Sequence, residues 1–188
     1  MVAGLLSGGC LASSDAMTEI STPRVESPPE GAATVVFIRP NSTAPDTVVT
    51  IFSSEGKFIG DSVAGSCFSR IMSPGHHVFV GAADNISVMT AELVPKKTYF
   101  VEVAVNTGSI SVRSHLFGVH RAEGNAVGKV GRWLGDCDFY DVDADVGQAR
   151  LDKDREATVT QIHRAELALT KYPRKELKRR SLRAEDGR

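Results

Sequence analysis

The stretch Thr98-Tyr99-Phe100-Val101-Glu102-Val103-Ala104-Val105 decides the fold class of this chain. Its residues are apolar, β-branched or aromatic, which is the composition of a strand in a largely buried sheet. Lys96-Lys97 before it and Asn106-Thr107-Gly108-Ser109 after it mark turns, so the strand is bounded on both sides. A strand of this strength needs neighbours, and the segments around it carry the same signature.

Working outward, seven further short strands are expected, separated by turns such as Ser54-Glu55-Gly56-Lys57 and Ser73-Pro74-Gly75-His76. Short strands at this spacing predict a mainly β domain over residues 33–118, an antiparallel sandwich or barrel. The pattern leaves open which side chains face inward. The expected core comprises Val36, Ile38, Ile51, Phe79, Phe100 and Val103.

The segments 73–80 and 91–103 carry a family resemblance. They resemble a proline-glycine turn and strand, followed by a glycine-lysine-threonine-tyrosine strand, found in bacterial lipoproteins with a β-sandwich of unknown function and in PEGA-like and prealbumin-like surface domains. The opening strand that ends Phe37-Ile38-Arg39-Pro40 fits the same plan, while Lys96 stands where the family usually has Gly. The resemblance implies an extracytoplasmic, antiparallel, immunoglobulin-like or prealbumin-like β-sandwich, often lipid-tethered, with no known catalytic residues to carry over.

The N-terminal segment Leu5-Leu6-Ser7-Gly8-Gly9-Cys10 resembles the lipobox of bacterial lipoproteins, in which the thiol takes a diacylglycerol. Ser7 stands where that pattern prefers Leu, and the nine residues before Cys10 hold no Lys or Arg. Residues 1–10 are therefore interpreted as a truncated signal whose start codon is assigned too far downstream. The alternative is a disordered N-terminus with an incidental cysteine.

Residues 11–32 are rich in Ser, Thr, Pro and Glu and are expected to form a flexible linker behind the lipid anchor. The predicted localisation is the bacterial cell envelope. Because Leu11 replaces the Asp that commonly retains lipoproteins at the inner membrane, the resemblance favours the outer membrane and periplasm.

The composition and net charge of the chain limit the classes of function that it can have. The chain has 188 residues, 41% apolar and 24% charged, which fits one ordinary domain with appendages or two small domains. The net charge of -1 gives no pull toward nucleic acid. No apolar run approaches the ~18 residues of a membrane-spanning helix. We identify no cofactor and no small-molecule substrate from the sequence.

Cys67 and Cys137 are the two cysteines left over if Cys10 is acylated. A disulfide between them would close a long loop and stabilise the fold by roughly 3–4 kcal/mol. The competing interpretation is two buried thiols that act as small apolar side chains. No Cys-x-x-Cys or Cys/His spacing indicates zinc.

The C-terminal part is expected to be helical. Residues 119–145 are interpreted as an irregular Gly- and Asp-rich connection, and residues 146–188 as a helix with a basic tail. Pro173 ends or kinks the helix, and residues 184–188 are expected to fray. A narrow apolar stripe at helical spacing is expected to dock on the sandwich; it comprises Leu151, Thr158, Ile162, Ala165, Leu169 and Tyr172.

Two charged segments are candidates for a functional site. Asp141, Asp143, Asp145 and Asp152 match part of an EF-hand loop, but Val146 occupies the position that needs Gly. The alternative role for these carboxylates is to cap the following helix. The basic tail is a candidate polyanion contact or a solvated helix end; its cations are Arg174, Lys175, Lys178, Arg179, Arg180 and Arg183.

Together these observations predict a lipid-anchored extracytoplasmic protein, with a non-catalytic binding or structural role. Its expected partners are the membrane, through lipid at Cys10, and an envelope protein or cell-wall polymer. One alternative is a calcium-dependent binder or hydrolase using residues 136–145. The other is a cytoplasmic adaptor using the basic helix.

Overall fold

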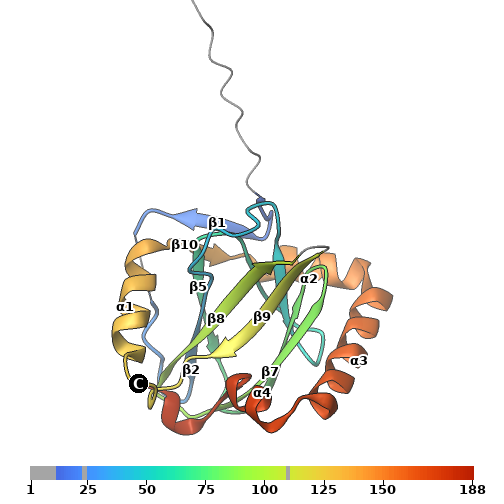
Figure 1. Ribbon diagram of the computed structural model, residues 1–188. Coiled ribbons are helices and arrows are strands. Elements are labelled where there is room, and N and C mark those ends of the chain that lie inside the picture. The colour runs from blue at the N-terminus through green and yellow to red at the C-terminus, as the bar shows by residue number, and fades with distance from the viewer. Residues whose placement is uncertain (1–11, 23–24, 109–110) are drawn as a thin grey trace, which may run out of the picture.

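A computed structural model of the protein describes residues 12–22, 25–108 and 111–188. The fold is mainly β: two mixed sheets face one another, and helices cover their outer surfaces (Figure 1). The strands are β1 (Met17–Ile20), β2 (Ala33–Ile38), β3 (Val49–Ser53), β4 (Phe58–Ser62), β5 (Ser66–Met72), β6 (Gly75–Ala82), β7 (Ile86–Leu93), β8 (Thr98–Thr107), β9 (Val112–Gly118), β10 (Asp138–Val142) and β11 (Ser181–Leu182). The helices are α1 (Ala126–Asp136), α2 (Ala144–Lys153), α3 (Arg155–Lys171) and α4 (Arg174–Arg179), with a 3-10 turn at Ala184–Asp186.

The strand order corrects the expectation of purely antiparallel sheets. The first sheet runs β1-β10-β5-β2-β8-β9 and the second β11-β7-β6-β3-β4. Hairpins such as β6–β7 are antiparallel, but β2 pairs with β8, β10 with β5 and β11 with β7 in parallel. Turn signals identify strands that follow one another in a hairpin. They carry no information on partners that are distant in sequence, and each parallel pair is of that kind.

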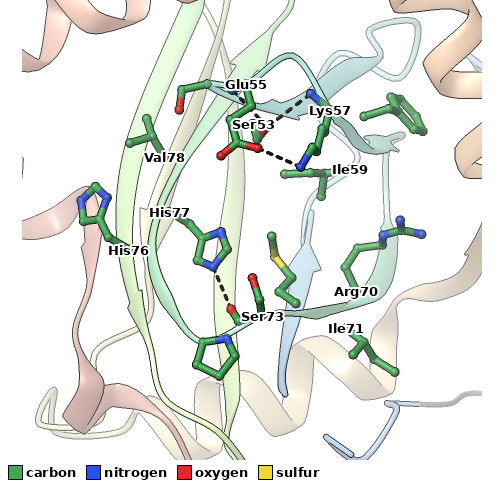
Figure 2. Close-up of a pocket in the computed structure, with 14 residues that line it drawn as sticks. Ser53, Glu55, Lys57, Ile59, Arg70, Ile71, Ser73, His76, His77 and Val78 are labelled. Carbon is green, nitrogen blue, oxygen red and sulfur yellow. Dashed lines mark hydrogen bonds and ion pairs between the residues drawn. The ribbon is translucent and has the colours of Figure 1, made fainter. Parts of the chain in front are cut away.

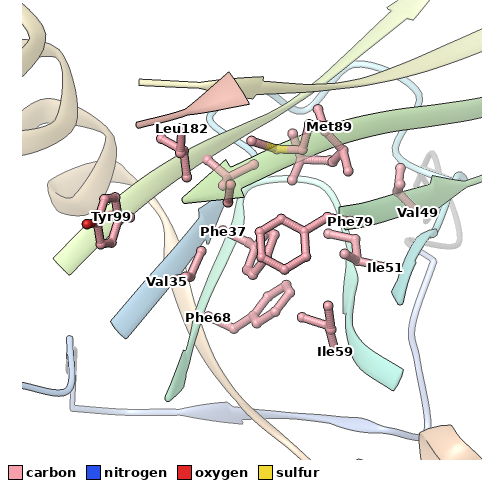
Figure 3. Close-up of a cluster of buried hydrophobic side chains, with 14 of the residues drawn as sticks. Val35, Phe37, Val49, Ile51, Ile59, Phe68, Phe79, Met89, Tyr99 and Leu182 are labelled. Atoms are coloured by element: carbon pink, nitrogen blue, oxygen red, sulfur yellow. The ribbon is translucent and has the colours of Figure 1, made fainter. Parts of the chain in front are cut away.

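The core lies between the sheets and continues under the helices. Phe37 of β2 stacks on Phe68 of β5 at 5.1 Å between ring centroids and meets Phe79 of β6 edge-on at 5.5 Å (Figure 3). The six residues expected in the core are all buried, but they divide between two clusters. Ile51, Phe79 and Val103 lie between the sheets, whereas Val36, Ile38 and Phe100 lie beneath α1.

The predicted linker is folded in part. β1 pairs with β10 over four residues and forms the edge of the first sheet. The Ser14 hydroxyl donates to the buried carboxylate of Asp61 at 2.5 Å, and Arg150 of α2 donates to the same oxygen at 2.6 Å. Sequence composition misses this strand because its partner is more than a hundred residues away along the chain.

The expected irregular connection also contains regular structure, α1 and β10. α1 has three glycines, Gly128, Gly131 and Gly135, and therefore low intrinsic helix propensity. Burial of one face offsets that propensity: Ala126 and Val130 pack with Trp133 on the outer face of the first sheet.

The expected single C-terminal helix is two helices that meet at Asp154, the cap residue of both. The predicted stripe packs as expected. Leu151 and Ala165 are buried on the outer face of the second sheet, with Ile162, Leu169 and Tyr172 beside them.

The expected fraying of residues 184–188 is wrong. The backbone of Arg188 exchanges two hydrogen bonds with Thr98, of 2.9 and 3.0 Å, and the buried Asp186 carboxylate lies 2.9 Å from Nδ1 of His120. These long-range contacts hold the C-terminal segment against β8 and the residues that follow β9.

Candidate functional site

A cavity of about 550 Å³ opens where the beginning of β4 in one sheet separates from the end of β5 in the other. We call it the mouth. At the beginning of β5, away from the mouth, β10 pairs with Ser66 and Cys67 and extends the first sheet. The residues that line the mouth are Ser53, Ser54, Glu55, Lys57, Phe58, Ile59, Arg70, Ile71, Met72, Ser73, Pro74, His76, His77 and Val78.

The mouth forms where the inward-facing positions of two strands change from apolar to polar. On β5 the inward side carries Phe68, then Arg70, because Phe68 is paired with the core residue Phe37 and side chains alternate along a strand. On β6 the same alternation places His77 two residues before the core residue Phe79, and the two rings stack at 6.0 Å. The space between the sheets therefore stays apolar in its centre and becomes polar at this opening.

The charges at the mouth are unequally compensated. Lys57 pairs with Glu55 at 2.9 Å, and both side chains are exposed. This hydrogen bond and the charge of Lys57 lower the pKa of Glu55. Arg70 is half-buried, and no hydrogen bond or ion pair joins its guanidinium to another of the described residues. Burial lowers the pKa of Arg70, and the charge of Glu26 opposes that shift.

The two histidines of this segment lie on opposite sides of β6, as expected for neighbours on a strand (Figure 2). His77 points into the mouth and its Nε2 lies 2.8 Å from the Ser73 carbonyl oxygen (Figure 2). That contact fixes the ring across the Ser73-Pro74 turn. His76 is paired in register with Glu92 of β7 and points away from the opening.

Chemically, the mouth offers cationic and hydroxyl groups above an apolar floor. Ile59 and Met72 pack against the core between the sheets and supply the floor. Ser53 Oγ accepts hydrogen bonds from the backbone N–H groups of Glu55 and Lys57, 3.2 Å each, which orders the rim. Such an arrangement suits the binding of an anion.

The predicted site residues are dispersed around the molecule. Cys10 lies outside the described residues. Cys67 and Cys137 are joined by a disulfide, with Cα atoms 6.0 Å apart, so the chain takes the first of the two alternatives left open for these cysteines. The bridge ties β5 to the end of α1.

The predicted aspartates do not converge on one point. Asp143 is the N-cap of α2, and its Oδ1 accepts a hydrogen bond from the Val146 backbone N–H at 3.1 Å, so the capping interpretation is confirmed for this residue. Asp141 lies on β10 opposite Thr18, Asp145 lies in the first turn of α2, and Asp152 accepts from Gln148 within the same helix. Across residues 12–22, 25–108 and 111–188, no three His, Cys, Asp or Glu side chains gather to hold a metal ion.

The basic tail is divided. Arg180 is 3% exposed, so this residue is not a surface contact as predicted. It donates to Glu176 at 2.7 Å and Ser87 at 2.8 Å, and it lies 2.8 Å from Nδ1 of His115. The other cations of the predicted set are exposed: Arg174, Lys175, Lys178, Arg179 and Arg183.

Sequence reasoning missed the mouth, although one signal was present. Phe68-x-Arg70-x-Met72 alternates like a strand with one face in the core, and it places an arginine on that face. Charged side chains are rarely buried unless they are paired, so an arginine on the inward side favours an opening at that end of the strand. The partners Lys57 and His77 carry no such signal until the register of the sheets is known.

Among the described residues, no helix is long and apolar enough to cross a membrane. Comparisons with protein-family models, with curated proteins and with solved structures give no match for this chain.

Proposed function

We propose that this protein is a lipid-anchored, extracytoplasmic protein of the bacterial envelope with a non-catalytic binding role, and that the mouth is its binding site. The observation that carries the proposal is the disulfide between Cys67 and Cys137. Disulfides persist in oxidising compartments such as the periplasm and are rare in the cytosol. The bridge also leaves Cys10 as the one cysteine available for acylation, since the chain has three.

The position of the first described residues supports this arrangement. The Ala12 backbone N–H donates to the Pro45 carbonyl at 2.9 Å, in the connection between β2 and β3. Cys10 is two residues earlier, so at most ~7 Å of chain separates it from Ala12. A lipid at Cys10 holds the body close to the bilayer rather than on a long tether.

A buried arginine stabilises the connection between β2 and β3, to which Ala12 is hydrogen-bonded. The Arg39 guanidinium is fully buried and donates to four backbone carbonyls, those of Thr43, Ala44, Thr47 and Ser62, at 2.6–3.2 Å. Burial lowers the pKa of Arg39, and the nearby charge of Asp46 opposes that shift. The anchored end is therefore a rigid part of the fold.

The mouth lies at the other end of the strands. β3 begins at Val49, close to Pro45, and ends at Ser53 on the rim of the mouth, so one strand length, roughly 15 Å, separates the two ends. With lipid at Cys10, the mouth faces away from the membrane and toward ligands in the compartment. The finer family assignment, an immunoglobulin-like or prealbumin-like sandwich of the PEGA-like lipoproteins, is part of this proposal and is supported in outline by the two facing sheets.

Metabolic labelling tests the anchor. Cells of the native bacterial host take up an alkyne analogue of palmitate, and the protein is isolated and scored for label. The expected result is label on the wild type and on Cys137→Ala, and none on Cys10→Ala. Equal labelling of wild type and Cys10→Ala, or no label on either, overturns the proposed anchoring.

A further inference from the structure

The mouth holds one cation, Arg70, that no described residue pairs directly. Its charged lining residues are Glu55, Lys57 and Arg70, with the two histidines beside them. Glu55 compensates Lys57 directly, at 2.9 Å. Arg70 has Glu26 as its electrostatic neighbour but makes no ion pair within 4 Å to any described residue. A half-buried cation without a direct partner is the group that gains most from an incoming anion.

The floor limits what that anion can carry. Ile59 is almost fully buried and Met72 is partly buried, and both pack against the cluster between the sheets. A ligand held by Arg70 at the rim therefore rests its next atoms on aliphatic side chains. The volume of about 550 Å³ is in the range of small-molecule sites and is too small for a folded partner.

Ser53 adds a hydrogen-bond donor to the lining, whereas His77 does not. The Ser53 hydroxyl accepts two backbone N–H bonds and keeps its own proton to donate. His77 donates its Nε2–H to the Ser73 carbonyl, so Nδ1 of the neutral ring is an acceptor, and His77 lines the mouth without binding the anion. Ser53 and Arg70 line the same cavity, so one ligand can meet both donors.

We infer that the mouth binds a small organic anion, a single carboxylate or phosphate group on a short apolar body. Arg70 and Lys57 hold the charged group at the rim, and Ile59 and Met72 receive the apolar body. This inference rests on the proposed binding role of the mouth and is independent of acylation at Cys10.

Titration of the full-length, unacylated, ¹⁵N-labelled protein tests the inference by amide chemical shifts. The probes are octanoate and octyl phosphate as anions, octyltrimethylammonium as the cation of matched chain, and acetate and inorganic phosphate as anions without the apolar body. We expect both octyl anions to shift the amides of residues 53–59 and 70–78 to saturation. The octyl cation is expected to shift none of these amides, and acetate and inorganic phosphate are expected to bind more weakly than the octyl anions.

Two variants test which cation of the mouth binds the anion, and a third serves as a control. Arg70→Gln is expected to weaken octanoate binding by about tenfold or more, because a charge-assisted hydrogen bond is lost. Lys57→Gln tests the rim should Arg70→Gln fail to fold. Arg113→Gln removes an exposed arginine of β9 that does not line the mouth, and octanoate binding is expected to be unchanged.

Equal binding of the octyl cation, or no saturable shift with either octyl anion at millimolar concentration, overturns the inference. If inorganic phosphate binds as tightly as octyl phosphate, the inferred contact between the apolar body of the ligand and the floor of the mouth is overturned. None of these outcomes alters the labelling of Cys10, so the failure of this inference and the failure of the proposed anchoring are told apart.

Discussion

Removal of the Cys67–Cys137 disulfide is expected to cost about 4 kcal/mol of unfolding free energy. The two residues are 70 positions apart, and closing a loop of that length removes roughly this much conformational free energy from the unfolded chain. The bridge also holds a weak junction, since β10 pairs with β5 over two residues, Asp138 with Ser66 and Phe139 with Cys67. The double variant Cys67→Ala/Cys137→Ala therefore loses a long-range constraint at the place where the first sheet is least continuous.

Urea denaturation of the oxidised wild type and the double variant measures the effect. With a slope of about 2 kcal/mol per molar urea, the midpoint is expected to fall by about 2 M. Hydrogen exchange should show the largest loss of protection in β1 and β10, which depend on this junction. Cys10→Ala is the matched control and leaves the midpoint unchanged. A loss below about 1 kcal/mol, or a uniform loss of protection across both sheets, would refute the reasoning.

Other perturbations test separate parts of the fold. Arg180→Met is expected to lower the unfolding free energy by more than about 2 kcal/mol in denaturation, because charge-assisted hydrogen bonds inside the molecule are lost; no loss would contradict its buried role. Burial, and then the charge of Arg180, lowers the pKa of His115 in the folded protein, so the unfolded chain binds the proton at higher pH and the unfolding free energy falls as pH drops below about 6.5. His115→Gln should flatten that decline, and an unchanged pH profile of stability in this variant would contradict the role of His115. Lys96→Gly is expected to raise the unfolding free energy by about 1 kcal/mol, because Lys96 has a φ of 62°, a left-handed conformation that costs a non-glycine residue about 1 kcal/mol. A fall in the denaturation midpoint would contradict this expectation. Asp143→Ala should cost about 1 kcal/mol through loss of the N-cap, whereas Asp141→Ala should be close to neutral, and equal effects would reject the capping role.

The position of Lys96 shows how a departure from a pattern carries structural information. The proposed PEGA-like resemblance predicts Gly at this place, and the backbone here adopts the conformation that glycine favours. The Lys96 backbone N–H donates to the Ala32 carbonyl at 2.7 Å, which ties this turn to the start of β2. The turn geometry is thus present although the favoured residue is not.

The local patterns of the sequence determined most of the individual elements. Runs of β-branched and aromatic residues predicted the strands from β2 to β9, and Gly56 and Gly75 mark turns where φ is positive, 78° and 116°. The apolar stripe predicted that the C-terminal helices dock on a sheet, and Asp143 was among the expected caps. These features depend on residues within one or two turns of one another, so neighbouring residues along the chain are sufficient to predict them.

Only the tertiary structure decided the pairing of segments that are distant along the chain. β1 becomes a strand through β10, α1 forms despite three glycines because it covers Val36 and Ile38, and the C-terminal residues are held by Thr98 and His120. The mouth has the same origin. Arg70 lies on β5 and Lys57 lies in the turn before β4, and both line the cavity where the sheets diverge. Register decides which side of β5 faces inward, and sequence periodicity leaves that side undetermined.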